Sequence, residues 1–434
     1  MIAEPVEVYR HDMAVVRDHM VEARTSLLRQ PAGLPYWVVL AITGALTVCA
    51  AAALAYRLTT STQLVDWGYA AATAAFLVSS VQAAPALAAI TRLTRGHWAV
   101  SLHRIADLMA LGGLVTVPLV LILLYQLPQW KGRPSIWFDL VTAPQAPDAG
   151  AIVLLAFAGL AILWLSAAPV RAGTPKSWEA VQLGLVLLGS LYIALLVYVD
   201  MLVISDLGVS LVNGWHSSDM PVYQAFTGFE GALASVIVAL ACLRRFGGLR
   251  AYIKEDVFKA LSKLLLAFAL LFIWFFWAEF LTFWYGRLPD EKDLMTLFMF
   301  GSYLVPFSIA IFCNFLLPVA LLIWNSARAS IAGTTAVAVV VLIGNFADRV
   351  RLYVPSWSLA GPIADHFGAQ PPTRLPDVAD LLIVFGCPAA VLFLILLALR
   401  FLPPIAIWEH QRDLLLRFER PFAKAIMPVV AKVD

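Results

Sequence analysis

Ten long apolar stretches, separated by short polar connections, dominate the pattern of hydrophobic and polar positions. A helix needs roughly 20 mainly apolar residues to cross a hydrocarbon core about 30 Å thick, and ten segments meet that need. The predicted spans are Tyr36–Tyr56, Trp67–Leu93, Ile105–Gln126, Gly150–Val170, Trp178–Leu207, Val222–Arg244, Val257–Gly286, Leu294–Trp324, Ala329–Tyr353 and Val378–Leu402. We therefore expect an all-α integral membrane protein of about ten transmembrane helices.

Composition agrees with this class. Only 13% of the residues are charged and 61% are hydrophobic, whereas soluble domains are roughly a quarter charged. The chain thus needs lipid as its solvent, and membrane lipid is an expected partner. Its basic residues form no continuous basic stripe, so nucleic acid is not expected as a partner.

The distribution of basic residues predicts the orientation, because positive charge is retained on the cytoplasmic side. The connection between the sixth and seventh spans carries six basic residues, while the segment between Asp206 and Val222 carries none. We expect both termini in the cytoplasm and a multi-pass protein of the bacterial cytoplasmic membrane. Residues 1–35 are expected to form a cytoplasmic amphipathic segment, 36–402 the ten-helix domain, and 403–434 a cytoplasmic or interfacial tail with a second surface helix around Trp408 to Arg420.

Histidine and cysteine positions argue against a redox cofactor held by this chain. A membrane cytochrome b binds haem between imidazoles on facing helices, but all seven histidines are predicted to lie in loops or tails. The four cysteines fall in four separate apolar segments, without the paired spacing of a metal site, and are expected to be small core residues. We expect no cofactor bound covalently or by metal ligation.

Ionisable residues inside the predicted spans are the candidate functional residues, because each costs about 2.5 to 3.5 kcal/mol to insert. The candidates near the outer side are Asp200, Asp206, Glu230, Glu279, Asp348 and Arg349, expected at one depth. The candidates near the inner side, for a proton path, are Asp107, Glu179 and Lys263. Buried carboxylates can relay protons or accept them from a quinol hydroxyl. The alternative is structural pairing of Asp348 with Arg349 or Arg351, and helix capping by Asp206.

Two local motifs combine such acids with turns and aromatic residues. After the fifth span, Asp206 is followed by Ser210, Trp215 and His216 within the segment 205–219. After Glu279 in the seventh span, the chain reads Trp-Tyr-Gly-Arg-Leu-Pro-Asp-Glu over 284–291.

These motifs resemble the NrfD/PsrC family of polysulfide reductase membrane subunits, and most closely the ActF-like membrane subunit of alternative complex III. Asp206, Ser210, Leu211, Trp215, His216 and Ser217 keep the spacing of one family pattern, with Ser218 in place of Thr. Lys263-Leu264 with Ala267-Phe268, the segment 284–291 with Arg287 in place of Asn, and Arg104-Ile105-Ala106-Asp107 match three further patterns.

The resemblance implies two four-helix bundles plus two extra helices, without a cofactor in the subunit. It implies exchange with the quinone pool, menaquinone or ubiquinone, near the outer face. It also implies partners: a ferredoxin-like iron–sulfur subunit, a molybdopterin-type or cytochrome c subunit, and a second NrfD-like subunit. The departures at Arg287 and Ser218 put strict functional equivalence in doubt.

Three functions remain open at this point. The first is a quinone- or quinol-interacting membrane anchor of a respiratory oxidoreductase complex, passing electrons to or from an extracytoplasmic iron–sulfur partner. The second is a proton-conducting or secondary-transporter-like subunit without a quinone site, for which matched Gly/Pro interruptions in both halves would argue; the sequence shows no matched pair. The third is a passive scaffold that only holds a peripheral enzyme at the membrane. The sequence does not decide whether the subunit is non-catalytic or reacts with quinone.

Overall fold

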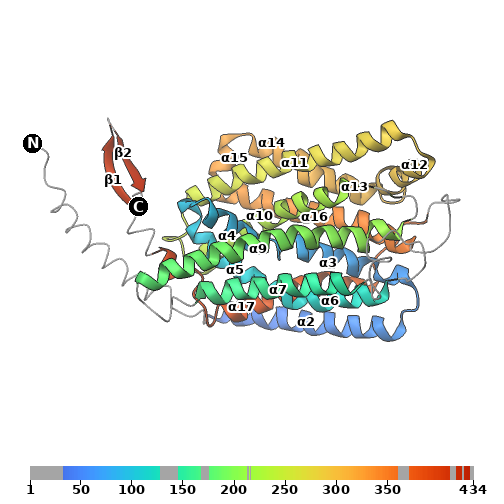
Figure 1. The fold of residues 1–434 in the computed structure, drawn as a ribbon, viewed down its shortest axis with the longest axis horizontal. Helices are drawn as coiled ribbons and strands as arrows, with labels where there is room; N and C mark the ends of the chain where they lie inside the picture. Colours follow the sequence, from blue (N-terminus) through green and yellow to red (C-terminus); the bar gives the residue numbers. More distant parts are fainter. Residues whose placement is uncertain are drawn as a thin grey trace, which may run out of the picture.

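The computed structural model describes residues 33–127, 145–167, 175–212, 215, 217–359, 371–410, 417–422 and 425–430. Ten helical segments in this part of the chain are long and apolar enough to cross a membrane. Figure 1 shows them side by side along the long axis of the molecule. The prediction of an all-α, ten-helix multi-pass membrane protein is therefore confirmed.

In the first half, the second and third spans are each built from several shorter elements, whereas α2, α7 and α9 are long continuous helices. In chain order these elements are α2 (Leu34–Thr60), η1 (Leu64–Trp67), α3 (Gly68–Ser80), α4 (Ala84–Leu93), η2 (His97–Ala99), α5 (Val100–Met109), η3 (Ala110–Gly112), α6 (Gly113–Gln126), α7 (Ala146–Ala167), α9 (Pro175–Leu207) and η4 (Val209–Leu211).

In the second half, α10, α11, α16 and α17 are continuous helices, and the elements between α11 and α16 are short. Its elements are α10 (Met220–Phe246), α11 (Glu255–Gly286), α12 (Pro289–Met295), η5 (Thr296–Phe300), α13 (Leu304–Ile311), η6 (Phe312–Leu316), α14 (Leu317–Leu322), α15 (Asn325–Ala329), α16 (Ile331–Ser358) and α17 (Val378–Ala398).

The helices pack as two groups of four spans and one further pair. Helices α3–α4, α5–α6, α7 and α9 contact one another, as do α10, α11, α13–α14 and α16. The first and last spans, α2 and α17, form the most extensive helix pair. Helix α3 contacts both α10 and α16, so the two groups meet along α3. In Figure 1, α2 and α11 lie at opposite edges of the molecule.

Most span boundaries differ from the prediction by up to five residues, and two starts differ by more. The third span begins at His97 rather than Ile105, because the polar side chains of His103 and Arg104 find partners inside the protein and do not end the helix. The eighth begins at Leu304 rather than Leu294, because the chain turns at Gly301–Tyr303 after the π-helical η5.

Two spans of the first half are interrupted part-way along. Span two breaks at Val81–Ala83, just before Pro85, and the N–H groups of Val81 and Gln82 both donate to the carbonyl of Leu77. Span three is interrupted by the 3₁₀ turn η3. The sequence did not reveal the turn η3, since Ala110–Gly112 contains no proline.

Other expectations changed with the structure. The expectation that all four cysteines are core residues was wrong: only Cys387 is buried, and Cys49 and Cys242 are exposed. An apolar segment does not require burial inside the protein, because the surface that faces lipid is apolar too. The interfacial helix predicted in the tail was wrong over 417–420, where β1 (Arg417–Phe422) pairs antiparallel with β2 (Ala425–Val430). The predicted amphipathic segment at 1–35 lies almost wholly outside the described residues.

Candidate functional site

A buried ionic cluster on α16 occupies the junction between the two four-helix groups. Asp348 accepts hydrogen bonds from the hydroxyl of Tyr223 at 2.8 Å and from Arg351 Nε at 2.8 Å. Arg349 lies 3.2 Å from the other oxygen of the same carboxylate. The side chains of Asp348, Arg349 and Arg351 are almost completely buried. Asp348 is therefore paired with both arginines, and these three side chains together carry one net positive charge.

Hydroxyl and amide groups extend this cluster across α3 and α10. Arg349 donates to Thr227 Oγ1 at 2.7 Å and to Ser79 Oγ at 3.4 Å. The amide of Asn345 donates to the carbonyl of Thr227 at 2.6 Å and accepts from Ser80 Oγ at 3.3 Å. Arg349 is thus held by groups from both four-helix groups.

Two further buried carboxyl groups, those of Glu230 and Asp200, interact with this cluster. Both oxygens of Glu230, and Oδ1 of Asp200, are buried and find no hydrogen-bond partner among the described residues. Glu230 interacts electrostatically with Asp348 and Arg349, and Asp200 interacts with Arg349. Leaving such a group without a partner costs free energy. The structure thus brings four of the predicted residues together: Asp200, Glu230, Asp348 and Arg349.

Glu279 belongs to a separate site near the C-terminal end of α11. One of its oxygens accepts a hydrogen bond from Ser217 Oγ at 2.6 Å, and the other finds no partner among the described residues. Ser217 also accepts from the backbone N–H of Met220, at the start of α10. Trp215 is buried against Phe298, with ring centroids 4.9 Å apart. His216 lies outside the described residues.

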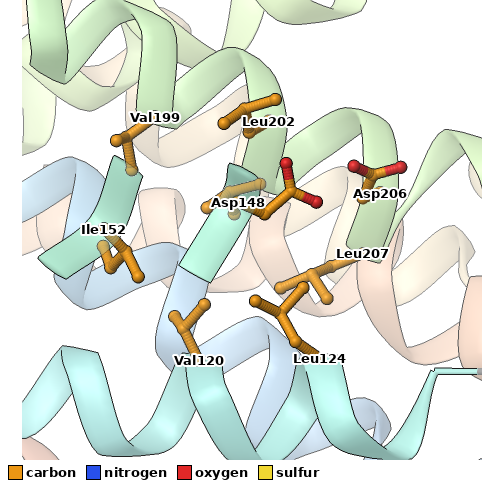
Figure 2. Close-up of a pocket in the computed structure, with 9 residues that line it drawn as sticks. Val120, Leu124, Asp148, Ile152, Val199, Leu202, Asp206 and Leu207 are labelled. Carbon is orange, nitrogen blue, oxygen red and sulfur yellow. The ribbon is translucent and has the colours of Figure 1, made fainter. Parts of the chain in front are cut away.

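Asp206 lies in a third place, a small apolar pocket at the ends of α6, α7 and α9. Figure 2 shows the carboxyl groups of Asp206 and Asp148 among aliphatic side chains of this pocket. Both aspartates are buried. Ser210 donates to the backbone carbonyl of Asp206 at 3.1 Å. Sequence reasoning missed Asp148, because it assigned that residue to a loop, whereas α7 begins before it.

The predicted single layer of outer acids therefore divides into three sites. These sites are the Asp348 cluster with Glu230 and Asp200, the Glu279–Ser217 pair, and the pocket with Asp148 and Asp206. Asp206 is the second-last residue of α9, whereas Glu230 lies nearly three turns inside α10. The two carboxyl groups therefore lie at different depths.

A second ionic cluster lies at the opposite end of the first four-helix group. Arg92 bonds both oxygens of Asp107, at 2.9 and 2.7 Å, and its Nε donates to Glu409 at 3.1 Å. The other oxygen of Glu409 accepts from His103 Nδ1. The expectation that every histidine lies in a loop or tail was wrong for His103, which is buried in α5. Glu409, in the segment after α17, gives this buried histidine a hydrogen-bond partner.

The chain following α17 packs back into this cluster. Trp408 Nε1 and Arg104 both donate to the carbonyl of Ser166, at 3.1 and 2.8 Å. Burial opposes ionisation of Glu409, but Arg92 and His103 outweigh it and lower the pKa of this carboxyl to about 2. Sequence reasoning missed Arg92, His103 and Glu409, since their contacts join residues more than 300 positions apart.

The three inner candidates are not brought together. Asp107 is fully buried and paired with Arg92, whereas Glu179 and Lys263 are exposed on α9 and α11. No group of three His, Cys, Asp or Glu side chains suited to a metal ion occurs in the part of the chain that the structure describes.

Comparison with protein-family models gives no match to the chain, and comparison with the curated proteins gives none either.

Proposed function

We propose that this chain is the quinone- or quinol-interacting membrane anchor subunit of a respiratory oxidoreductase complex in the bacterial cytoplasmic membrane. It faces the quinone pool, menaquinone or ubiquinone, and works beside an extracytoplasmic iron–sulfur partner that carries the electrons. Its resemblance to the NrfD/PsrC family, over the motifs around Asp206, Lys263 and Glu279, supports this proposal. A molybdopterin-type or cytochrome c subunit and a second NrfD-like subunit are the further partners we propose.

One observation supports this function above the others: Glu230 and Asp200 are buried beside Arg349, and three of their four carboxyl oxygens find no hydrogen-bond partner among the described residues. Oxidation of a quinol to a quinone releases two electrons and two protons, and the protons need acceptors within reach of an apolar site. A carboxylate placed in this way can act as a general base toward a quinol hydroxyl.

The test uses the assembled complex in proteoliposomes with a soluble quinol. We expect Glu230→Gln to lower quinol-linked turnover at least about tenfold, the loss typical of removing a positioned acid or base, while the complex stays assembled. Glu255→Gln, which neutralises an exposed carboxylate at the start of α11, is the matched control and should keep full turnover. Full turnover in Glu230→Gln, Asp200→Asn and their double variant would contradict the proposal.

A second candidate is a proton-conducting subunit without a quinone site. It is favoured by the hydrogen bonds that link Arg349, Thr227, Asn345 and Ser80 across three helices, and by the break in span two directly after Ser80. Interrupted helices with free backbone groups are a feature of transporters. Proton flux in proteoliposomes that hold this chain alone, unaffected by quinone analogues and lost in Glu230→Gln, would favour this function over the first.

A further inference from the structure

The connection between α10 and α11 carries an ordered basic loop at the end of the bundle where the segment after α17 packs. Helix α10 ends at Phe246, and Gly248 adopts a positive φ of 70°, which reverses the chain. Arg244 then closes the loop, because it donates to the carbonyl of Arg250 at 2.9 Å and to that of Ile253. Leu249 and Ile253 are buried and anchor the loop to the protein. The ring of Tyr252 packs against His410.

This loop leaves three cations and one aromatic ring exposed. Arg245, Arg250 and Lys254 are exposed, and none of them forms an ion pair with another described residue. Phe246 is 84% exposed at the end of its span. Two carboxylates follow the loop, but Glu255 lies 3.9 Å from Arg244 and Asp256 lies 3.4 Å from Lys259. The charge of the three cations is therefore not neutralised within the described part of the chain.

A site of this composition suits the headgroup of an anionic phospholipid. Guanidinium and ammonium groups donate to phosphate oxygens, and basic clusters next to a membrane span attract anionic lipids. An exposed aromatic ring at a span's end lies at the level of the headgroups, with its apolar face toward the acyl chains. We propose that the loop 244–254 binds the phosphate of an anionic glycerophospholipid through Arg245, Arg250 and Lys254, with Phe246 against its chains.

The loop's internal hydrogen bonds strengthen this assignment over a diffuse surface attraction. Arg244 uses its guanidinium to order the backbone, so the three exposed cations stand on a fixed frame rather than on a flexible tail. Ordering them in advance reduces the entropy lost when a headgroup binds. The function proposed above plays no part in this inference.

The experiment reconstitutes the full chain in nanodiscs of phosphatidylcholine with a minor fraction of photoactivatable phosphatidylglycerol. We expect the cross-link to map to residues 243–256. We also expect the triple variant Arg245→Gln, Arg250→Gln, Lys254→Gln to reduce labelling there roughly tenfold, since each cation near a membrane surface contributes to anionic lipid binding. Photoactivatable phosphatidylcholine should label this segment weakly in both proteins.

A matched control removes cations from the other side of the membrane. Arg287→Gln with Lys292→Gln changes two exposed cations near α12 and should leave labelling of 243–256 unchanged. Equal labelling by the two lipids, or labelling retained in the triple variant, would overturn the proposal. Loss of labelling on addition of millimolar inorganic phosphate would assign the site to free phosphate instead, and would also overturn the lipid assignment.

Discussion

Glu409 shows what a single residue contributes at the end of the bundle where the segment after α17 packs. Arg92 and His103 hold its two oxygens, and all three side chains are buried. Burial alone would favour the protonated acid, but the two partners lower the pKa of Glu409 from 4.5 to about 2. Its pairing therefore stabilises the folded protein above about pH 4.5, and that contribution declines as the pH falls from 4.5 toward 2.

Replacing Glu409 by Gln is predicted to destabilise the protein strongly at neutral pH. The variant leaves Arg92 and His103 without their shared carboxylate, and breaking a buried pair in this way costs about 3 to 5 kcal/mol. The measurement is the thermal unfolding midpoint in detergent, at pH 7 and at steps down to pH 3. We expect a lower midpoint for Glu409→Gln at pH 7 and a smaller decline of that midpoint with acid. An unchanged midpoint at pH 7, with Glu255→Gln as the exposed control, would show that the pairing does not stabilise the fold.

The sequence could predict part of this residue-scale chemistry and not the rest. Pairing of Asp348 with Arg349 or Arg351 was one of two interpretations, since the three lie within one turn of a single predicted helix. The cluster of Arg92, His103 and Glu409 could not be predicted, because it exists only after the chain following α17 folds back onto α4 and α5. A lone carboxylate in a tail gives no signal of such a contact.

At the scale of elements, the contact between α3 and α10 decides how closely the two four-helix groups approach. A methyl group added at Gly228 would lie 2.9 Å from Ser79 Cβ and 3.3 Å from the Ser79 carbonyl oxygen. Close approach of this kind is typical where small residues line a helix interface in membranes. It also keeps Ser79 within reach of Arg349.

Gly228→Ala is predicted to lower the thermal unfolding midpoint by forcing α3 and α10 apart. Overpacking a tight interface typically costs about 1 to 3 kcal/mol, even though alanine is intrinsically the better helix former. Gly150→Ala is the matched control, because an added methyl group there meets no atom within 4 Å. We expect the control to match or slightly exceed the parent protein in stability. If both variants behaved alike, the α3–α10 contact would not be tight.

The sequence could predict that ten spans exist, but not where each span is interrupted or begins. Each span was evident from about 20 apolar residues, which lipid requires regardless of neighbours. The early start of the third span depended on internal partners for His103 and Arg104, which are tertiary contacts that no local pattern encodes. The break at Val81–Ala83 does have a local signal, Pro85, but the hydrogen bond from the hydroxyl of Tyr192 to the carbonyl of Gln82 is again a tertiary contact.

At the scale of the whole molecule, a third ionic cluster ties the pair of α2 and α17 to the second span. Arg57, near the end of α2, is buried and lies 3.3 Å from Asp66, 2.5 Å from Asp377 and 3.0 Å from Asp380. Arg374 bridges Asp66 and Asp380 at 3.4 and 3.0 Å. The first span, the start of the second and the start of the last are thus joined at one end of the bundle.

This arrangement predicts that Arg57→Gln loosens the α2–α17 pair while the two four-helix groups stay intact. Asp380 and Asp377 would lose their cation from α2. The remaining contacts of α2 with α17 are apolar contacts that lipid can replace and one hydrogen bond at the other end of the pair, from the hydroxyl of Tyr36 to the carbonyl of Leu396. The measurement is hydrogen–deuterium exchange resolved by segment. We expect faster exchange at the ends of α2 and α17 nearest Arg57 and unchanged exchange in α10, with Lys292→Gln, an exposed cation on the same side, as the control. Faster exchange throughout the protein would mean that the cluster supports the entire fold, and no change anywhere would mean that the other contacts between α2 and α17 are enough to hold α2 in place.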